Sequence, residues 1–286
     1  MDRLLVATDF SVRSDRALRR ATLIARRLNR PLTLVHVVDS DRAEKLIASE
    51  HAAASELLDD ISATLASEGQ VDSDWRVIVD DIPSGILTAA DDAGAGLIVI
   101  GPHRRRLTDI FTGTTAERLV QRSTCPLLVA VHTPAADHSH TLLALDFDAA
   151  SKSAGRTALA MGVFNHTDVV VMHAFDAPAV GMMKRSLDQT AEIEGYVANE
   201  ATSAAEKLRQ LSEELGLPSS DQSVSLMEGS AANSILKAAR QLDSDLIVLG
   251  TNQRKGFTRA LVGSVTADVI HDAQRDVLII PVDERA

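Results

Sequence analysis

The chain has few of the features that cross-link a protein or anchor it in a membrane. Its 286 residues include a single cysteine, Cys125, so no intrachain disulfide can form. It contains no run of about 18 apolar residues, the length that a membrane-spanning helix needs. It also does not open with the basic-then-apolar segment of a secretory leader, because a short apolar run already begins at Leu4. From these absences we expect a cytoplasmic protein.

The chain is also poor in aromatic residues and in positive charge. Aromatic residues make up 3% of the sequence, so any core must be built from Leu, Ile, Val and Ala. The formal net charge of −11 repels polyanions, and we therefore expect neither nucleic acid nor an anionic membrane as a partner. The nine histidines show no metal-ligand spacing, so we predict no metal centre held by protein ligands alone.

What the chain does contain is an internal repeat. The motif around Asp9 recurs around Asp146, and two further echoes follow in the same order. The matching segments are 3–11 and 141–148, 97–101 and 246–250, and 113–119 and 263–269. A repeat of this length indicates two whole domains rather than the short units of a solenoid. We predict a first domain at residues 1–133, a linker at 134–140 and a second domain at 141–286.

Short apolar segments alternate with helix-period segments in each half. In the first half, apolar runs at 4–7, 32–38 and 96–100 are separated by stretches with helical periodicity. Strands this apolar are typical of a parallel sheet covered by helices on both faces, and right-handed crossovers then give a doubly wound sheet. We predict an α/β protein with two doubly wound, five-stranded parallel-sheet domains in tandem.

Two helices of the first half have readable ends. The first is expected from about residue 14 to residue 28, with Ser11 or Ser14 as its N-cap. The second is Ala- and Leu-rich, runs from about residue 41 to residue 67, and is predicted to end near Gly69.

The chemistry gathers at one edge of each predicted sheet. In a doubly wound sheet, ligands bind beyond the carboxyl ends of the strands, where the strand order reverses. Asp9 and Asp146 end the first strand of their halves, and loops that open at Gly101 and Gly250 follow the fourth strand at the same edge. Each loop leads to a helix that begins with a small residue and a hydroxyl residue: Gly113-Thr114 and Gly263-Ser264.

A helix start of this kind offers free N–H groups and a positive dipole end, which suit a phosphate. A carboxylate opposite such an anion site is what a nucleotide requires, with its sugar or base at one end and its phosphates at the other. Structural readings stay open beside this one. Asp9 and Asp146 are also suited to capping the turn and helix that follow, and Gly101 and Gly250 to permitting a sharp exit from the strand.

The second half resembles the universal stress protein family. The signature of that family is Gly-x2-Gly-x9-Gly-[Ser/Thr] after a strand, with an Asp at the end of the first strand. Here Gly250 and Gly263-Ser264 keep the full spacing, and the helix begins Gly-Ser-Val-Thr-Ala-Asp-Val. The departure is Gln253, where nucleotide-binding members of the family have glycine. Its amide and the charge of Arg254 are suited to contact a phosphate.

The first half departs further from the same pattern. Gly101-Pro-His-Arg104 also lacks the second glycine, and the spacing to Gly113 is shorter. Val37 matches the valine that lines the adenine pocket in the family, whereas the second half has Ala174. The resemblance therefore implies a pocket that is better preserved in the second half and degraded in the first.

The resemblance implies a stress-response protein that senses or holds a nucleotide of the ATP type, with or without Mg²⁺, and that acts through the ligand or through a protein partner. A slow ATPase and a ligand-free interaction scaffold are the alternatives. The two halves are expected to pack as an internal pseudo-dimer through the strands at 127–131 and 277–282, and further homodimerisation stays open. The residues expected to contact the nucleotide are Asp146, Ala174, Gly250, Gln253, Arg254, Gly263, Ser264 and Val265 in the second half, and Asp9, Val37, Gly101, Gly113 and Thr114 in the first.

Overall fold

The computed structural model describes residues 2–102, 114–177, 179–180, 183, 190–217, 221–226, 230–252 and 263–282. Within these ranges the chain divides into two compact units. The first contains Met1–Asp137 together with Gln274–Pro281, and the second contains His138–Asn252 together with Gly263–Ala273. The domain boundaries expected at residues 133 and 141 stay predictions.

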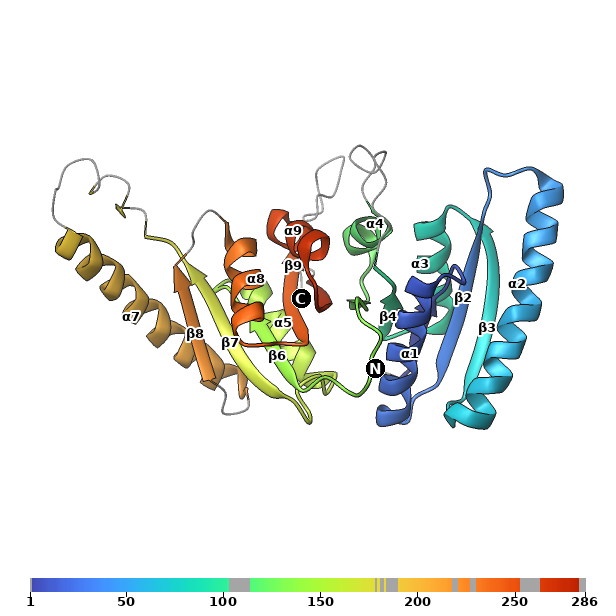
Figure 1. The fold of residues 1–286 in the computed structure, drawn as a ribbon, viewed down its shortest axis with the longest axis horizontal. Coiled ribbons are helices and arrows are strands. Elements are labelled where there is room, and N and C mark those ends of the chain that lie inside the picture. Colours follow the sequence, from blue (N-terminus) through green and yellow to red (C-terminus); the bar gives the residue numbers. More distant parts are fainter. Residues whose placement is uncertain are drawn as a thin grey trace. The chain divides into compact units, whose positions relative to one another are not determined.

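The first unit alternates strands and helices as predicted (Figure 1). Its elements are β1 (Leu4–Ala7), α1 (Val12–Leu28), β2 (Leu32–Asp39), α2 (Glu44–Thr64), β3 (Ser73–Asp80), α3 (Ile82–Ala93), β4 (Leu97–Ile100), α4 (Thr115–Arg122), β5 (Leu127–Val129) and β10 (Asp276–Val282). The strands lie in the order β3-β2-β1-β4-β5-β10. Pairing is parallel from β3 to β5, so the prediction of a parallel, doubly wound sheet is confirmed.

Buried aliphatic side chains hold this sheet together. Leu4 of β1 lies in register with Leu32 of β2 on one side and with Leu97 of β4 on the other. All three are almost completely buried, because helices cover the strands: α1 packs against β1 and β4, and α3 packs against β2. In the order β3-β2-β1-β4-β5, the chain runs from β1 to β3 on one side of β1 and continues with β4 on the other side. The strand order therefore reverses at β1, and such sheets bind ligands at that point.

Of the two serines expected as the N-cap of α1, Ser11 and Ser14, the structure uses Ser11. The Ser11 hydroxyl accepts a hydrogen bond from the Ser14 N–H, so Ser11 is the N-cap. Ser14 lies in the first turn and uses its own hydroxyl toward the Ser11 carbonyl.

The helical segment that begins with α2 ends at Gly69, as predicted, and only the conformation of its end differs from a glycine cap. The helix begins at Glu44 and passes into a π-helical turn at Leu65–Gly69. The residue in the left-handed conformation is Gln70, with φ of 53°, rather than Gly69. Gly69 is buried, and its carbonyl accepts a hydrogen bond from Arg26 Nε of α1. A tertiary contact, which local patterns do not reveal, therefore determines how this helix ends.

Strand β10 comes from the second repeat of the sequence but groups with the first unit. It pairs antiparallel with β5, so that Val277 lies opposite Val129 and Ile279 lies opposite Leu127. The expected approach of these two strands is therefore confirmed, whereas the pseudo-two-fold arrangement of the halves stays a prediction.

The second unit repeats the same plan. Its elements are β6 (His140–Ala144), α5 (Ala149–Ala160), β7 (Asp168–Phe175), α7 (Thr190–Leu215), β8 (Asp221–Leu226), α8 (Ala231–Gln241), β9 (Leu246–Asn252) and α9 (Ser264–Asp272). The strands lie in the order β9-β6-β7-β8, and β6 pairs in parallel with β9 and β7, as β7 does with β8. Strand β6 occupies the place that β1 has in the first unit. In the described part of the chain, no helix combines the length and the apolar character that crossing a membrane requires.

Candidate functional site

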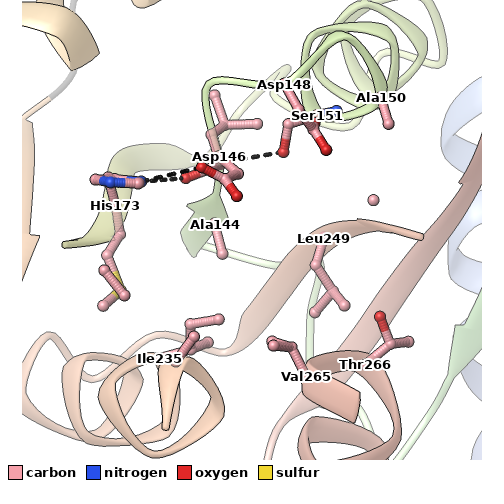
Figure 2. Close-up of a pocket in the computed structure, with 15 residues that line it drawn as sticks. Ala144, Asp146, Asp148, Ala150, Ser151, His173, Ile235, Leu249, Val265 and Thr266 are labelled. Atoms are coloured by element: carbon pink, nitrogen blue, oxygen red, sulfur yellow. Dashed lines mark hydrogen bonds and ion pairs between the residues drawn. The ribbon is translucent and has the colours of Figure 1, made fainter. Parts of the chain in front are cut away.

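The second unit has a cavity of about 200 Å³ at the carboxyl ends of β6, β7 and β9 (Figure 2). Helices α5, α8 and α9 contribute the remaining walls. Apolar side chains, including Ile235 and Leu249, lie on one side of the opening, and Asp146 lies on the other (Figure 2). The cavity is lined by Ala144, Leu145, Asp146, Asp148, Ala150, Ser151, Met172, His173, Ala174, Ala231, Ile235, Leu249, Gly250, Val265 and Thr266.

Hydrogen bonds at the start of α5 hold Asp146 in place. The Asp146 N–H donates to the Ser151 hydroxyl at 2.7 Å, and the Asp146 carboxylate accepts from the Phe147 N–H at 2.8 Å. Asp148 caps α5 by accepting from the Ser151 N–H at 2.7 Å. The hydrogen bond from the Phe147 N–H therefore agrees with a structural role for Asp146 in the turn before α5. The carboxylate is nevertheless exposed at the mouth of the cavity, with a side-chain accessibility of 73%.

His173 forms part of the cavity wall beside Asp146. Its Nδ1 lies 3.0 Å from the Leu145 carbonyl oxygen, and since a carbonyl only accepts, Nδ1 carries the proton. The same nitrogen lies 4.0 Å from Asp146 Oδ1, and the ring packs on Phe147 with 4.1 Å between centroids. The backbone thus fixes the orientation of the imidazole at the end of β7.

The start of α9 differs from the other helix starts in its N-cap residue. That residue is Gly263, and among the residues that the structure describes no side-chain hydrogen bond caps this end of the helix. The first N–H groups of any helix lack intrahelical acceptors and carry the positive end of the dipole. Val265 and Thr266, from this first turn, line the cavity. The second unit therefore combines an exposed carboxylate with a helix start whose amide donors are suited to an anion.

The first unit has the corresponding cavity, of about 280 Å³. It lies at the carboxyl ends of β1, β2 and β4, between the starts of α1 and α4 and the side of α3. The lining residues are Ala7, Thr8, Asp9, Ser11, Arg13, Ser14, Val35, His36, Val37, Ile82, Ile86, Ile100, Gly101, Pro102, Thr115 and Ala116.

Asp9 has the same kind of partners as Asp146. Its carboxylate accepts from the Ser11 N–H at 3.1 Å, and its own N–H donates to the Ser14 hydroxyl at 3.3 Å. Burial by itself would raise the pKa of Asp9, but the hydrogen bonds from Ser11 and Ser14 and the charge of Arg13 outweigh it and hold this pKa below its ordinary value. Asp9 is therefore an anion at neutral pH.

His36 repeats the arrangement of His173. Its Nδ1 lies 2.9 Å from the Thr8 carbonyl oxygen, and its ring packs on Phe10 with 4.8 Å between centroids. The side chain is buried, and its Nε2 has no hydrogen-bond partner among the described residues. That nitrogen lies 3.5 Å from Glu50 Oε1 on α2.

Gly101 brings the exit of β4 against the first turn of α1. A Cβ atom at this position would lie 2.5 Å from the Arg13 carbonyl oxygen and 2.7 Å from the Arg13 carbonyl carbon. A side chain here would therefore force the backbone to move. This close approach gives the glycine a structural role, and it places the backbone of Arg13 beside the exit of β4.

Helix α4 differs from α9 because it caps itself. The Thr114 hydroxyl accepts from the Glu117 N–H at 3.2 Å, and the Glu117 carboxylate accepts from the Thr114 N–H at 2.6 Å. This capping box occupies two backbone donors with groups of the protein itself.

The structure brings together many of the residues expected from the sequence. Asp146, Ala174, Gly250 and Val265 line the second cavity, and Asp9, Val37 and Gly101 line the first. Three expected residues stand at the starts of α9 and α4 without lining a cavity: Gly263, Ser264 and Thr114. Gln253, Arg254 and Gly113 lie outside the described residues.

The sequence reasoning missed the serines and the histidine side chains of both cavities. The hydroxyls of Ser14 and Ser151 accept from the backbone N–H groups of Asp9 and Asp146, and His36 and His173 bind the carbonyl of the residue before each aspartate. The spacing of 137 residues that separates Asp9 from Asp146 also separates the members of both pairs. Comparing the two repeats position by position would have revealed them.

Comparison with known families agrees with the repeat. The model of the universal stress protein family matches this chain twice, over residues 1–131 and 138–281. This chain belongs to the universal stress protein family. The predicted tandem arrangement is thereby confirmed, with one match in each half.

This universal stress protein has relatives of both short and tandem length. It is 34% identical over 88 residues to universal stress protein MJ0531 of Methanocaldococcus jannaschii, a match that covers 31% of this chain and 50% of that protein. It is 23% identical to a universal stress protein of Mycolicibacterium smegmatis over 97% of this chain and 96% of the relative. A universal stress protein structure from Archaeoglobus fulgidus matches all of this chain and 98% of its own, with a TM-score of 0.71 at 16% identity. That likeness shows the shared fold.

Proposed function

We propose that this universal stress protein is a stress-response protein that binds an adenine nucleotide of the ATP type, with the second unit holding the better-formed pocket. The observation that carries the proposal is the pairing, in one cavity, of the Asp146 carboxylate with the first turn of α9, which has no side-chain cap. A ribose hydroxyl donates well to a carboxylate, and phosphate oxygens accept well from helix N–H groups.

The walls of the cavity suit the base of the same ligand. Ile235, Leu249 and Ala174 supply apolar surface between the two polar ends. An adenine ring placed there would contact apolar side chains. Mg²⁺ would enter with the phosphates, since it is commonly bound through substrate phosphates and only one or two carboxylates.

The first unit supports a weaker version of the same site. It keeps the carboxylate, the serine and the histidine, and Val37 adds apolar surface. Its helix start, however, already uses the Thr114 N–H for Glu117. A phosphate would have to displace that carboxylate or bind elsewhere in the cavity.

Titration of the full chain with Mg-ATP tests the proposal. We expect measurable binding by calorimetry and a mass shift of one nucleotide or two in native mass spectrometry. The variant Gly263→Glu should weaken the second site about 10- to 100-fold, because it places a carboxylate at the start of α9 and a lost charge-assisted hydrogen bond is worth about 1.5–3 kcal/mol. Apart from its chain neighbours, no atom of the described residues lies within 4 Å of a Cβ atom at Gly263, so the described part of the fold should tolerate the change.

Gly263→Gln is the matched control, since it adds nearly the same volume without the charge. If wild type shows neither heat nor a nucleotide-shifted mass, the proposal is wrong and the ligand-free scaffold becomes the better reading. Phosphate release that Asp146→Ala abolishes would instead favour the slow ATPase.

A further inference from the structure

The two cavities differ at one polar position. Aligning the repeats on their first-strand carboxylates places Arg13 opposite Ala150, and both residues line their cavities. The described lining of the second cavity contains carboxylates and His173 but no Arg or Lys. In the described lining of the first cavity, Arg13 is the cation.

Arg13 also differs from the other arginines of α1. Arg16 donates to the Val131 carbonyl and Arg26 to the Gly69 carbonyl, while Arg19, Arg20 and Arg27 pair with carboxylates. Arg13 makes no hydrogen bond or ion pair with a residue that the structure describes. Among the arginines of this helix, it is the one for which the described residues provide neither a hydrogen-bond acceptor nor a paired carboxylate, so its guanidinium is available to a ligand.

The position of Arg13 is fixed by packing. The contact between Gly101 and the Arg13 carbonyl ties the first turn of α1 to the exit of β4. The side chain is half-buried, which lowers the effective dielectric constant around its charge. Its charge acts on the Asp9 carboxylate in the same cavity.

The helix start in this cavity is less available than its counterpart in the second unit. The capping box of Thr114 and Glu117 engages the donors that α9 leaves without a side-chain cap. The N–H groups of Thr115 and Ala116 are outside the capping box, so this helix start offers an anion fewer donors rather than none. A guanidinium, which forms paired hydrogen bonds with phosphate oxygens, adds to them.

We infer that Arg13 is the specificity-determining residue by which the first cavity recognises the negative charge of a phosphate ester, whereas the second cavity recognises it through backbone N–H groups. The inference rests on the proposed function, because it takes adenine nucleotides as the ligand class. It assigns to each pocket its own means of binding phosphate.

The test compares ligands that share one nucleoside and differ in the number of phosphates: ATP, AMP and adenosine. Binding is measured calorimetrically in the full chain carrying Gly263→Glu, which suppresses phosphate binding in the second cavity. Adding Arg13→Ala should weaken ATP about 10- to 100-fold, since one charge-assisted hydrogen bond is worth about 1.5–3 kcal/mol. Adenosine, which has no phosphate, should change less than about twofold because it presents no anionic oxygen for a charge-assisted hydrogen bond with the guanidinium.

Arg19→Ala is the matched control. It removes the same charge from the same helix, at an exposed residue paired with Asp15 outside the cavity, and should leave all three affinities unchanged. In the reciprocal experiment, Ala150→Arg is combined with Thr115→Glu, which places a carboxylate in the first cavity. This pair should strengthen ATP binding in the second cavity about tenfold or more, for the same reason.

Three results would overturn the inference: equal losses for ATP and adenosine in Arg13→Ala, no loss for ATP, or an equal loss in Arg19→Ala. Absence of binding in the Gly263→Glu background, with binding in wild type, would also overturn it while leaving the proposed function in place. Absence of binding in wild type would overturn both.

Discussion

At the scale of single residues, close backbone contacts and shared hydrogen bonds make a few positions far more sensitive than their neighbours. Gly101 is one of them, because its missing side chain lets β4 approach α1. Asp245 is another, because one carboxylate holds several groups at the start of β6.

Substitution of Gly101 by Ala should lower the free energy of unfolding by about 1–3 kcal/mol, the usual cost of overpacking. The added Cβ would lie 2.5 Å from the Arg13 carbonyl oxygen, so backbone must move. Urea denaturation at neutral pH measures the effect. Gly195→Ala is the control: it lies in α7 with no atom within 4 Å of its added Cβ, and it should stabilise by about 0.5–1 kcal/mol. Equal effects of the two changes would contradict this explanation.

Acid should weaken the second unit partly through Asp245. Burial alone would raise the pKa of Asp245, but the N–H groups of Ser139 and His140 and the Ser139 hydroxyl donate to its carboxylate and hold this pKa below its ordinary value. A lowered pKa contributes stability that is present above the unfolded-state value of about 3.9 and is lost as the pH falls through the folded-state value.

We therefore expect Asp245→Asn to flatten the loss of stability below about pH 4, where the wild-type carboxylate binds its proton. Unfolding free energies measured by urea from pH 6 down to pH 2.5 give the slope. Asp168→Asn, at an exposed residue of β7, is the control and should leave the slope unchanged. A wild-type slope in Asp245→Asn would rule out this carboxylate as the source.

At the scale of the elements, the two helices that face the cavities begin differently. Helix α4 has a complete capping box, and α9 has Gly263 at its N-cap with no side-chain hydrogen bond. In the sequence, a hydroxyl residue follows a glycine before both helices, at Gly113-Thr114 and at Gly263-Ser264. The sequence pattern alone therefore does not distinguish the two helix starts.

Thr114→Ala should cost about 1 kcal/mol of stability, within the range of about 0.5–2 kcal/mol for a lost N-cap, because it removes the acceptor of the Glu117 N–H. Ser264→Ala is the matched change in the second unit and should cost about a few tenths of a kcal/mol or less, since Ser264 is not the N-cap residue and the described residues provide no side-chain cap for α9. Thermal and urea unfolding of both variants compare the costs. A larger loss in Ser264→Ala than in Thr114→Ala would contradict the difference seen between the two helices.

At the scale of the whole molecule, a buried ion pair joins segments from the two ends of the sequence. Arg20 Nε of α1 lies 2.9 Å from Asp276 Oδ2 of β10, across 256 residues of chain, and both side chains are less than 10% exposed. Arg20 also donates to the Ala136 carbonyl, and Asp276 accepts from the Val131 N–H. This network holds the C-terminal strand on the first unit.

Asp276→Ala should cost about 3–5 kcal/mol, because it leaves the Arg20 guanidinium buried without its carboxylate. Arg20→Met should cost a similar amount, because it leaves the Asp276 carboxylate buried without the guanidinium. The double variant should lose clearly less than the sum of the two, since neither charge is then left without its partner. Urea denaturation of all four proteins completes the cycle, and strict additivity would show that the pair does not act as a unit.

Much of the fold could be predicted because it rests on local patterns. The helix at Thr115–Arg122, the capping role of Ser11 and the apolar strands at Leu4–Ala7 and Leu32–Asp39 all follow from spacing, propensity and capping chemistry within a few residues. The carboxylates Asp9 and Asp146 were predicted at the cavities because parallel strands present their carboxyl ends at one edge.

The remaining features depend on partners that are distant along the chain. The sequence by itself determined that this protein has two doubly wound halves with a carboxylate at the switch point of each, because periodicity and repetition are properties of the chain alone. Only the tertiary structure decided that β10 joins the first unit and that Gln70 rather than Gly69 takes the left-handed turn. It also decided that α4 is capped by its own side chains while α9 is not. These outcomes depend on which groups meet after folding, and contacts across tens or hundreds of residues leave no periodic trace in the sequence.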